Sequence, residues 1–157
     1  MSMQQSTVRT NYFRVVDADG FERMMSHVIA TEDKVSVFTK EIGGIKKYAF
    51  GAYSSIAGVD EALYCQMTNT QSDDLDDDEY TEGRYNAFIV QLQDYVAEGD
   101  AVILMEAGHE KLCYVFGDAE IITRTEHEYV SLTDIAVDRA RGVLGDSYSD
   151  WETQMDY

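Results

Sequence analysis

The chain of 157 residues contains no proline and only two cysteines, Cys65 and Cys113. Without proline, its turns must be built from the 11 glycines together with Asp and Asn. Both cysteines fall in apolar segments, where a thiol packs as a small hydrophobic side chain, so no disulfide framework is expected. No apolar stretch approaches the roughly 18 residues of a membrane-spanning helix. The first residues lack the basic n-region and the apolar h-region of a signal peptide. We therefore expect a cytoplasmic protein that does not enter a membrane.

The motifs of common catalytic and cofactor sites are also missing. There is no GxxxxGK[ST] phosphate loop and no GxGxxG nucleotide loop. The three histidines and two cysteines lack the paired spacing of zinc ligands. His109 and Cys113 are four residues apart, but a turn followed by a strand does not place them on one face as nucleophile and base. The sequence therefore predicts no catalytic residue, no metal ligand and no cofactor.

Basic residues are scarce: 12 Lys and Arg stand against 30 Asp and Glu, which gives a formal net charge of −18. A small domain usually stays soluble with a net charge of about 2 to 8. Nucleic-acid affinity rests on Lys and Arg that neutralise phosphates, so this charge opposes direct binding to nucleic acid. A basic protein, in contrast, would be attracted and its association accelerated. We therefore expect a basic protein partner, while the oligomeric state stays open.

What the chain does contain is enough apolar sequence for a core. Hydrophobic residues make up 45%, and 11 Tyr, 6 Phe and 1 Trp exceed what an acidic disordered polymer carries. The length suits a single domain over 1–157. The order of helical and extended patterns predicts an α+β fold, in which about three helices pack on a mainly antiparallel sheet of about five or six strands.

The first half of the chain alternates extended and helical patterns. In order, these predict a strand (Thr10–Val16), a helix that Asp17 caps and whose apolar face extends to Val28, a hairpin (Lys34–Lys40 with Ile45–Tyr53), a loop or bulge (Ser54–Gly58), and a segment that suits either a helix or a strand (Val59–Met67).

The second half has the most regular pattern. Apolar residues at helical spacing predict an amphipathic helix over Tyr85–Val96, closed by Gly99. Next come three strand-like runs, separated by AlaGlyHisGlu and GlyAsp turns, which predict an antiparallel meander: Ala101–Glu106, Lys111–Phe116 and Ala119–Arg124. Tyr129–Leu132 is a further strand candidate. Ser131 or Thr133 is placed to cap a last helix, with apolar residues on one face, that Gly145 ends.

Part of the negative charge is concentrated in an acidic segment predicted as a loop over 68–82. Asp74, Asp76 and Asp78 match the first ligands of an EF-hand, but Glu79 stands where glycine is needed and Tyr85 where a bidentate Glu is needed, so no EF-hand calcium site is predicted. Weak, unspecific binding of divalent cations by the crowded carboxylates stays open. A solvated surface loop is the simplest interpretation. If the charge serves binding, the partner-binding residues of this segment are Asp73, Asp74, Asp76, Asp77, Asp78, Glu79 and Glu82.

Residues 146–157 form a second acidic segment, which also contains three aromatic residues. We predict an acidic tail whose end is mobile. The candidate partner-binding residues of the tail are Asp146, Asp150, Glu152 and Asp156.

The chain resembles small acidic accessory proteins of phages and conjugative elements. The shared features are its small size, its charge, the run Asp73–Glu79, its acidic aromatic tail and the segment GDAVILMEAGHEKLCYV (Gly99–Val115). These proteins include the anti-restriction and anti-CRISPR inhibitors that imitate DNA. They share no common motif, so the resemblance transfers no residue role. It implies a non-catalytic inhibitor whose carboxylates occupy the basic cleft of a nucleic-acid-handling protein such as a host defence nuclease.

Besides a housekeeping or structural role that the sequence does not specify, three alternatives to a DNA-mimic inhibitor remain open at this point. An immunity protein, or a docking subunit, would neutralise a basic toxin or another basic partner by charge complementarity. An enzyme would need a catalytic arrangement that one sequence does not reveal. A protein from a salt-rich habitat would be acidic throughout, without a specific use for the charge.

Overall fold

The computed structural model describes residues 5–145. Along this part of the chain the elements are β1 (Gln5–Thr10), α1 (Ala18–Met25), β2 (Val28–Ala30), β3 (Ser36–Ile42), β4 (Ile45–Ala52), β5 (Ile56–Val59), α2 (Glu61–Thr68), the 3-10 helix η1 (Ser72–Asp74), α3 (Asp77–Tyr95), β6 (Val102–Glu110), β7 (Tyr114–Ile122), β8 (His127–Ser131) and α4 (Leu132–Leu144).

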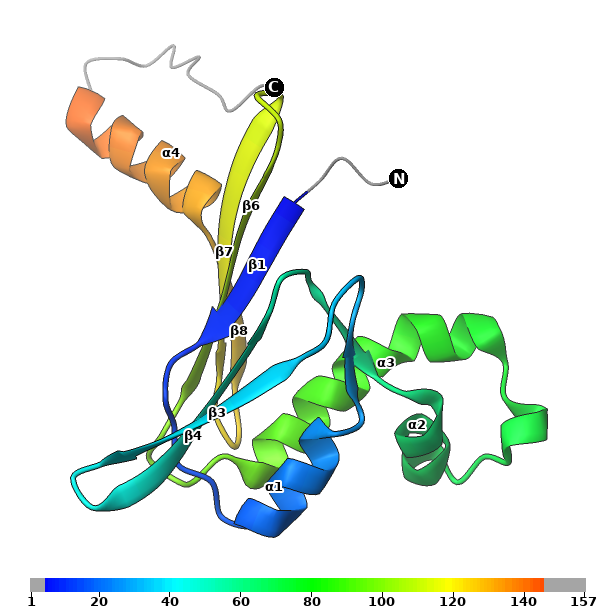
Figure 1. Ribbon diagram of the computed structural model, residues 1–157. Helices are drawn as coiled ribbons and strands as arrows, with labels where there is room; N and C mark the ends of the chain where they lie inside the picture. Colours follow the sequence, from blue (N-terminus) through cyan, green and yellow to red (C-terminus); the bar gives the residue numbers. More distant parts are fainter. Residues whose placement is uncertain (1–4, 146–157) are drawn as a thin grey trace.

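Six of these strands form an antiparallel sheet in the order β3-β4-β1-β6-β7-β8 (Figure 1). β2 and β5 pair separately as a two-stranded antiparallel ribbon. The predicted α+β class and mainly antiparallel sheet are therefore confirmed.

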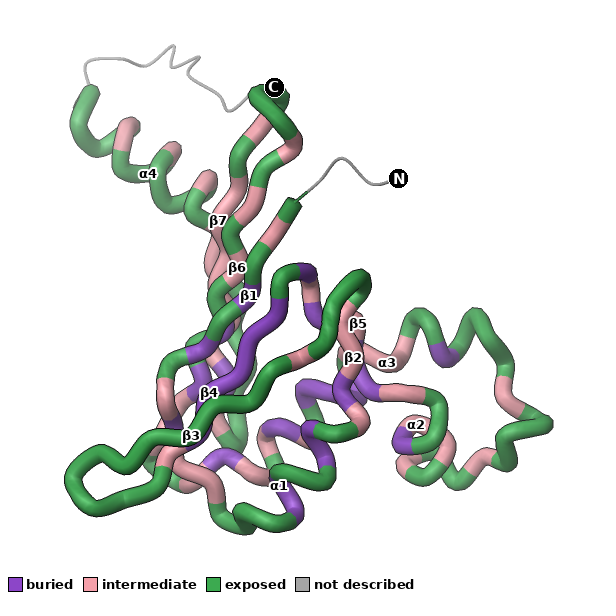
Figure 2. Tube along the Cα trace, viewed as in Figure 1, coloured by how far each residue is buried: buried purple, intermediate pink, exposed green. Residues whose placement is uncertain are grey.

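The hydrophobic core lies between one face of the sheet and helices α1 and α3. Alternation along β6 turns Val102 and Leu104 toward the core, and they belong to the same buried cluster as Phe88 and Leu92 of α3. Figure 2 shows buried segments concentrated on β4, α1 and the adjoining part of α3, whereas α4 has no buried residue. Burying one such side chain contributes about 1.5 to 3 kcal/mol, so the core stabilises both α1 and α3.

Two predicted elements of the first half are confirmed. α1 begins after Asp17, whose carboxylate accepts a hydrogen bond from the Gly20 backbone at 3.1 Å. β3 and β4 form the predicted hairpin, and Gly43 and Gly44 make its turn at φ 61° and 79°, which suits glycine. Val28 does not belong to the helix, because it opens β2 and pairs with Val59.

The predicted strand over Thr10–Val16 is wrong in position. β1 ends at Thr10, and beyond it only Phe13 and Val15 make isolated bridges, to Tyr48 and Val96. Phe13 is fully buried. The apolar residues that predicted a strand here therefore reflect burial of Phe13 in a connecting stretch.

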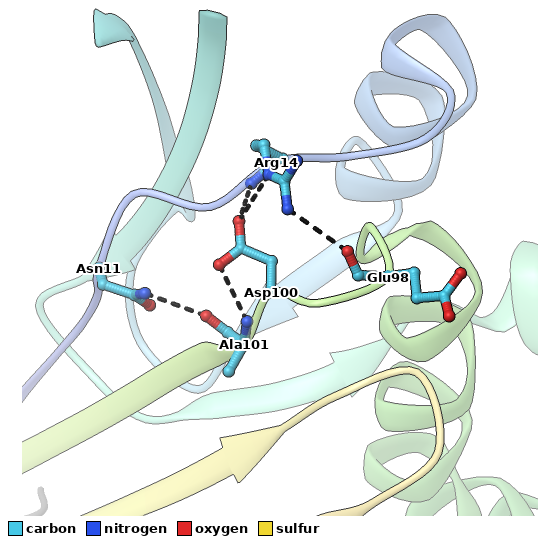
Figure 3. Close-up of polar contacts among 5 residues, drawn as sticks. All are labelled: Asn11, Arg14, Glu98, Asp100 and Ala101. Carbon is cyan, nitrogen blue, oxygen red and sulfur yellow. Dashed lines mark hydrogen bonds and ion pairs between the residues drawn. The ribbon is translucent and has the colours of Figure 1, made fainter. Parts of the chain in front are cut away.

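Arg14 and Asp100 hold that connecting stretch against the turn between α3 and β6 (Figure 3). The Asp100 carboxylate accepts hydrogen bonds from the Arg14 backbone at 2.8 Å, from Arg14 Nε at 3.4 Å and from the Ala101 backbone at 3.0 Å. Arg14 also donates to the Glu98 carbonyl at 3.3 Å, and Asn11 donates to the Ala101 carbonyl at 3.0 Å. Partial burial alone would raise the pKa of Asp100, but these hydrogen bonds outweigh burial and lower it.

The segment between the hairpin and the acidic residues is more regular than predicted. Ile56–Val59, expected mostly as loop or bulge, is strand β5. The ambiguous stretch after it is helix α2, because Asp60 caps it by accepting a hydrogen bond from the Leu63 backbone at 2.9 Å.

The predicted meander after α3 has wrong boundaries. β6 runs through the AlaGlyHisGlu stretch and β7 through GlyAsp, and the turn lies at Lys111–Cys113, where Lys111 has φ 49°. Gly108 is needed for a different reason, because a Cβ there would lie 2.2 Å from the Gln5 carbonyl oxygen of β1. The predicted strand Ala119–Arg124 is not a separate strand, because Ala119–Ile122 belongs to β7. The third strand of the meander is β8, which contains Tyr129–Ser131 of the further strand candidate. Cys113 lies exposed in the turn, so its predicted apolar burial is wrong.

The last predicted helix is confirmed as α4, whose start lies against β7 but which buries no residue on the sheet. Gly145 follows it at φ 80°, as expected of a helix end. No residue of α4 is buried, and Ile135 and Val143 of its apolar face are exposed. In Figure 1 the helix starts beside β7 and diverges from the sheet toward its C-terminal end.

Candidate partner-binding surface

The acidic segment predicted as a loop over 68–82 is largely helical. Ser72–Asp74 forms η1, and α3 begins at Asp77, eight residues before the apolar pattern at Tyr85. Asp76 caps α3, since its carboxylate accepts hydrogen bonds from the backbones of Asp78 at 2.9 Å and Glu79 at 3.3 Å. Acidic residues in the first helical turn are favourable because they face the positive end of the helix dipole.

A small aromatic cluster anchors the acidic end of α3. Tyr80 is buried, and its hydroxyl donates a hydrogen bond to the Val59 carbonyl at 2.9 Å. Its ring packs edge-on against Tyr64 of α2, with centroids 5.4 Å apart, and Arg84 lies 5.5 Å from the Tyr80 ring centroid. These contacts therefore fix the position of the helix end that carries the carboxylates around Tyr80. Figure 1 shows α2, η1 and the start of α3 projecting to the side, away from the six-stranded sheet.

The structure brings together the predicted partner-binding residues of this segment. All seven are exposed, and none makes an ion pair within the described part of the chain. We call them the α3 acidic cluster: Asp73, Asp74, Asp76, Asp77, Asp78, Glu79 and Glu82. The other four predicted residues, Asp146, Asp150, Glu152 and Asp156, lie outside the described residues.

The structure contains a second cluster of carboxylates, which the sequence did not predict. Glu106 of β6 and Asp118 and Glu120 of β7 point to the same sheet face as the core, and Glu106 and Asp118 are register partners. Together with Tyr85 and Tyr129 they line a cavity of about 170 Å³. We call these three carboxylates the sheet acidic cluster. In the sequence, the alternation that turns Val102 and Leu104 toward the core continues to Glu106. The predicted AlaGlyHisGlu and GlyAsp turns were misplaced, and they interrupted this alternation.

Each carboxylate of the sheet acidic cluster has a hydrogen-bond donor. Ser55 Oγ donates to Glu106 at 3.0 Å, and the Tyr129 hydroxyl donates to Asp118 at 2.6 Å. Glu120 accepts a hydrogen bond from the Tyr85 hydroxyl, and His127 Nε2 lies 2.7 Å from its other oxygen. The cluster is therefore a satisfied polar network at the end of the core.

The pKa values within this network follow from burial and neighbouring charge. Burial, with smaller contributions from Asp118 and Glu120, raises the pKa of Glu106 despite the hydrogen bond from Ser55. The hydrogen bond to Asp118 raises the pKa of Tyr129 to about 12, and burial with the bond to Glu120 raises that of Tyr85. Both tyrosines are thus neutral donors at pH 7.

The sheet acidic cluster does not resemble a ligand pocket. Its cavity is smaller than the roughly 300 to 1,000 Å³ of small-molecule sites. In residues 5–145 no group of three or more His, Cys, Asp or Glu side chains is arranged to hold a metal ion. The α3 acidic cluster therefore remains the best candidate for a functional surface.

The negative charge is unevenly distributed along the chain. Residues 1–59 contain 7 Lys and Arg and 6 Asp and Glu, whereas residues 60–157 contain 5 and 24. α1 and β1 to β5 are thus close to neutral. The excess belongs to the part of the chain that begins with α2.

No helix of the described segment is both long and apolar enough to cross a membrane. Comparisons of the chain with protein-family models, with curated proteins and with solved structures found no match. Functional inference therefore rests on the geometry and charge described above.

Proposed function

We propose that this protein is a non-catalytic inhibitor that binds a basic nucleic-acid-handling protein in the cytoplasm, of the anti-restriction or anti-CRISPR type. The observation that carries the proposal is the α3 acidic cluster, because its carboxylates are exposed and make no ion pair within residues 5–145.

The charge density of this cluster supports imitation of DNA. Five carboxylates lie between Asp76 and Glu82. At about 1.5 Å of rise per helical residue, this stretch extends about 9 Å, so it presents roughly one negative charge every 2 Å. Duplex DNA presents one charge per about 1.7 Å of its axis. A basic cleft shaped for phosphates would therefore meet a similar density of charge.

The anchoring of the cluster also favours binding. Tyr80 fixes the helix end to β5 and α2. A partner would therefore spend little free energy on ordering this surface. Stabilisation of α3 accounts for Asp76 and for the acids of its first turn, but not for Asp73, Asp74 and Glu82, which lie outside that turn. These three residues are unexplained by helix capping.

The charge distribution disfavours a general adaptation to salt. Such an adaptation would spread acidic residues over the whole surface, yet residues 1–59 contain as many bases as acids to within one. The immunity-protein alternative uses the same acidic surface, and competition with DNA separates it from the inhibitor.

The proposal is tested by capture of binding proteins from a bacterial lysate at low salt, with elution by a salt step and identification by mass spectrometry. The test variant removes six charges of the α3 acidic cluster but keeps the Asp76 cap: Asp73→Asn, Asp74→Asn, Asp77→Asn, Asp78→Asn, Glu79→Gln and Glu82→Gln. The matched control removes six exposed charges elsewhere, by the corresponding changes at Glu32, Glu41, Asp94, Glu98, Glu126 and Glu128.

We expect the wild type and the control to capture the same nucleic-acid-binding protein, and the test variant to lose it. Added duplex DNA should displace the captured protein, because both ligands occupy one basic cleft. Capture that persists in the presence of excess DNA would favour the immunity-protein alternative. Equal capture by both variants would refute a role for the cluster.

A further inference from the structure

Helix α4 and the uncovered face of the sheet enclose an apolar groove of about 800 Å³. The side chains of this face alternate with the core residues Val102 and Leu104, so they point away from α3. The apolar part of the groove is lined mainly by Ile103, Met105, Ala119, Val130, Leu132 and Ile135. None of these six residues is buried by any described part of the chain.

The helix beside this groove lacks the packing that a short helix needs. α4 has 13 residues, a length at which an isolated helix is marginal in water. Leu132, Ile135 and Val143 are exposed at spacings of three and eight residues, which places them along one stripe. Tertiary cover for this stripe would supply the missing stabilisation.

We propose that a second copy of the chain covers the groove, so that α4 of each copy packs against α4 and the uncovered sheet face of the other about a two-fold axis. A two-fold interface uses the same surface on both copies. It would therefore bury both unpartnered features, the groove and the apolar stripe of α4, in a single contact.

The exposed apolar area matches what such a dimer needs. Six side chains of the groove and α4 are between 41% and 76% exposed: Ile103, Met105, Leu132, Ile135, Val143 and Leu144. At about 100 Å² for each, they offer roughly 600 Å² of apolar surface. A standard interface of about 800 Å² per partner, about 65% apolar in homodimers, requires about 500 Å².

The charges of α4 also suit pairing with a second copy. At 3.6 residues per turn, Asp134, Asp138 and Arg141 lie on the side of α4 opposite its apolar stripe, so a contact through the stripe does not bury them. α4 has two acidic and two basic residues, so two copies of a chain with charge −18 can meet here without adding to their repulsion.

This interface is distinct from the α3 acidic cluster. In Figure 1, α4 and the start of α3 lie on different sides of the molecule. The two proposals therefore fail or succeed separately. Salt provides a further separation, since it should weaken binding to a basic partner but strengthen the dimer by screening the repulsion between copies.

The test is sedimentation of the full chain at concentrations from about 1 to about 100 μM, a range in which a dimer with a micromolar dissociation constant forms. We expect the mass of the wild type to approach twice 17.8 kDa as concentration rises. Met105→Glu and Ile135→Glu should each raise the dissociation constant more than about 100-fold, because the dimer would bury an unpaired charge. Val90→Glu is the matched control, since Val90 is an exposed apolar residue of α3 outside the groove, and this variant should remain dimeric.

A second measurement does not depend on variants. Amide exchange of residues 103–107 and 132–144 in the wild type should slow as concentration rises from the monomeric to the dimeric range. A wild type that stays monomeric throughout would overturn the proposal, and so would a dimer that Met105→Glu and Ile135→Glu leave intact. A monomer in which Trp151→Ser speeds exchange in these residues would instead assign the groove to the chain's own last segment.

Discussion

The two acidic clusters contain the same chemical groups in opposite surroundings. The carboxylates of the α3 acidic cluster are exposed and make no ion pair in the described chain, whereas each carboxylate of the sheet acidic cluster accepts a hydrogen bond from Ser55, Tyr85 or Tyr129. The density of acidic residues in the sequence identified the first cluster and missed the second. The number of carboxylates in a segment thus says little about which of them matter for stability.

We therefore expect the free energy of folding to depend on the sheet acidic cluster and on the residues that donate hydrogen bonds to it. Binding to a partner should depend on the α3 acidic cluster. Both clusters depend on α3, which carries one at its N-terminus and contributes Tyr85 to the other. Substitutions can therefore disturb both clusters together or one at a time.

The largest effect is expected for Leu92→Ala. Leu92 is fully buried, so its role as core, expected from the helical spacing, is confirmed. Truncation should lower the free energy of unfolding by about 2 to 5 kcal/mol, because it leaves a cavity beneath α3. Chemical denaturation measures this loss. Val90→Ala, at an exposed position of the same helix, should cost far less, and equal losses would contradict the assigned core face.

A smaller loss is expected for Tyr85→Phe, which acts on the sheet acidic cluster alone. It removes the hydroxyl that donates to Glu120 and leaves that oxygen without its donor in a partly buried site. We expect the free energy of unfolding to fall by about 1 to 3 kcal/mol. Tyr53→Phe is the control, because Tyr53 is 82% exposed. If both variants unfold at the same denaturant concentration, the sheet acidic cluster does not stabilise the fold.

A stabilising effect is expected for Glu106→Gln at pH 7. The raised pKa of Glu106 means that its charged form is disfavoured in the folded state, while a Gln carbonyl still accepts the hydrogen bond from Ser55. Because solvent screens a partly exposed group, we expect the free energy of unfolding to rise by about 0.5 kcal/mol.

The sign of the pH dependence tests this interpretation. A carboxyl group with a raised pKa in the folded state destabilises the fold above that pKa, and the penalty disappears as pH falls through it toward the unfolded value. The advantage of Glu106→Gln over the wild type should therefore shrink from pH 7 to pH 4. Glu98→Gln, at an exposed carboxylate, is the control. A gain that grows on acidification would contradict the assigned burial.

The sequence predicted the fold well where the apolar pattern and the local signals agreed. The helical spacing through Leu92 and the Gly43-Gly44 turn are of this kind, and both are confirmed. Boundaries failed where a local signal had another cause. Gly108 resembles a turn residue but is required by the close approach of β1, and Phe13 resembles a strand residue but is buried in a connection.

The candidate sites differ in the same way. The α3 acidic cluster is contiguous in sequence, so composition alone could find it. The sheet acidic cluster joins Glu106 to Asp118 and Glu120 by strand pairing and to Ser55 and Tyr85 by tertiary contact. Such contacts depend on the register of β6 and β7, which the misplaced turns made wrong. The helical form of Asp77–Glu82 was missed because acidic first turns lack an apolar face and depend on the Asp76 cap.

The smallest effect is expected for the combined variant Asp73→Asn, Asp74→Asn and Glu82→Gln, which removes charge from the α3 acidic cluster outside the first turn of α3. The free energy of unfolding should stay within about 0.5 kcal/mol of the wild type or rise slightly, because exposed like charges repel. Any rise should vanish at about 1 M salt, where the Debye length is about 3 Å. Asp76→Ala is the contrasting variant, and loss of its cap should cost about 1 kcal/mol. A loss of that size in the combined variant as well would show that these carboxylates stabilise the fold, and the two acidic clusters would then no longer differ in their effect on folding.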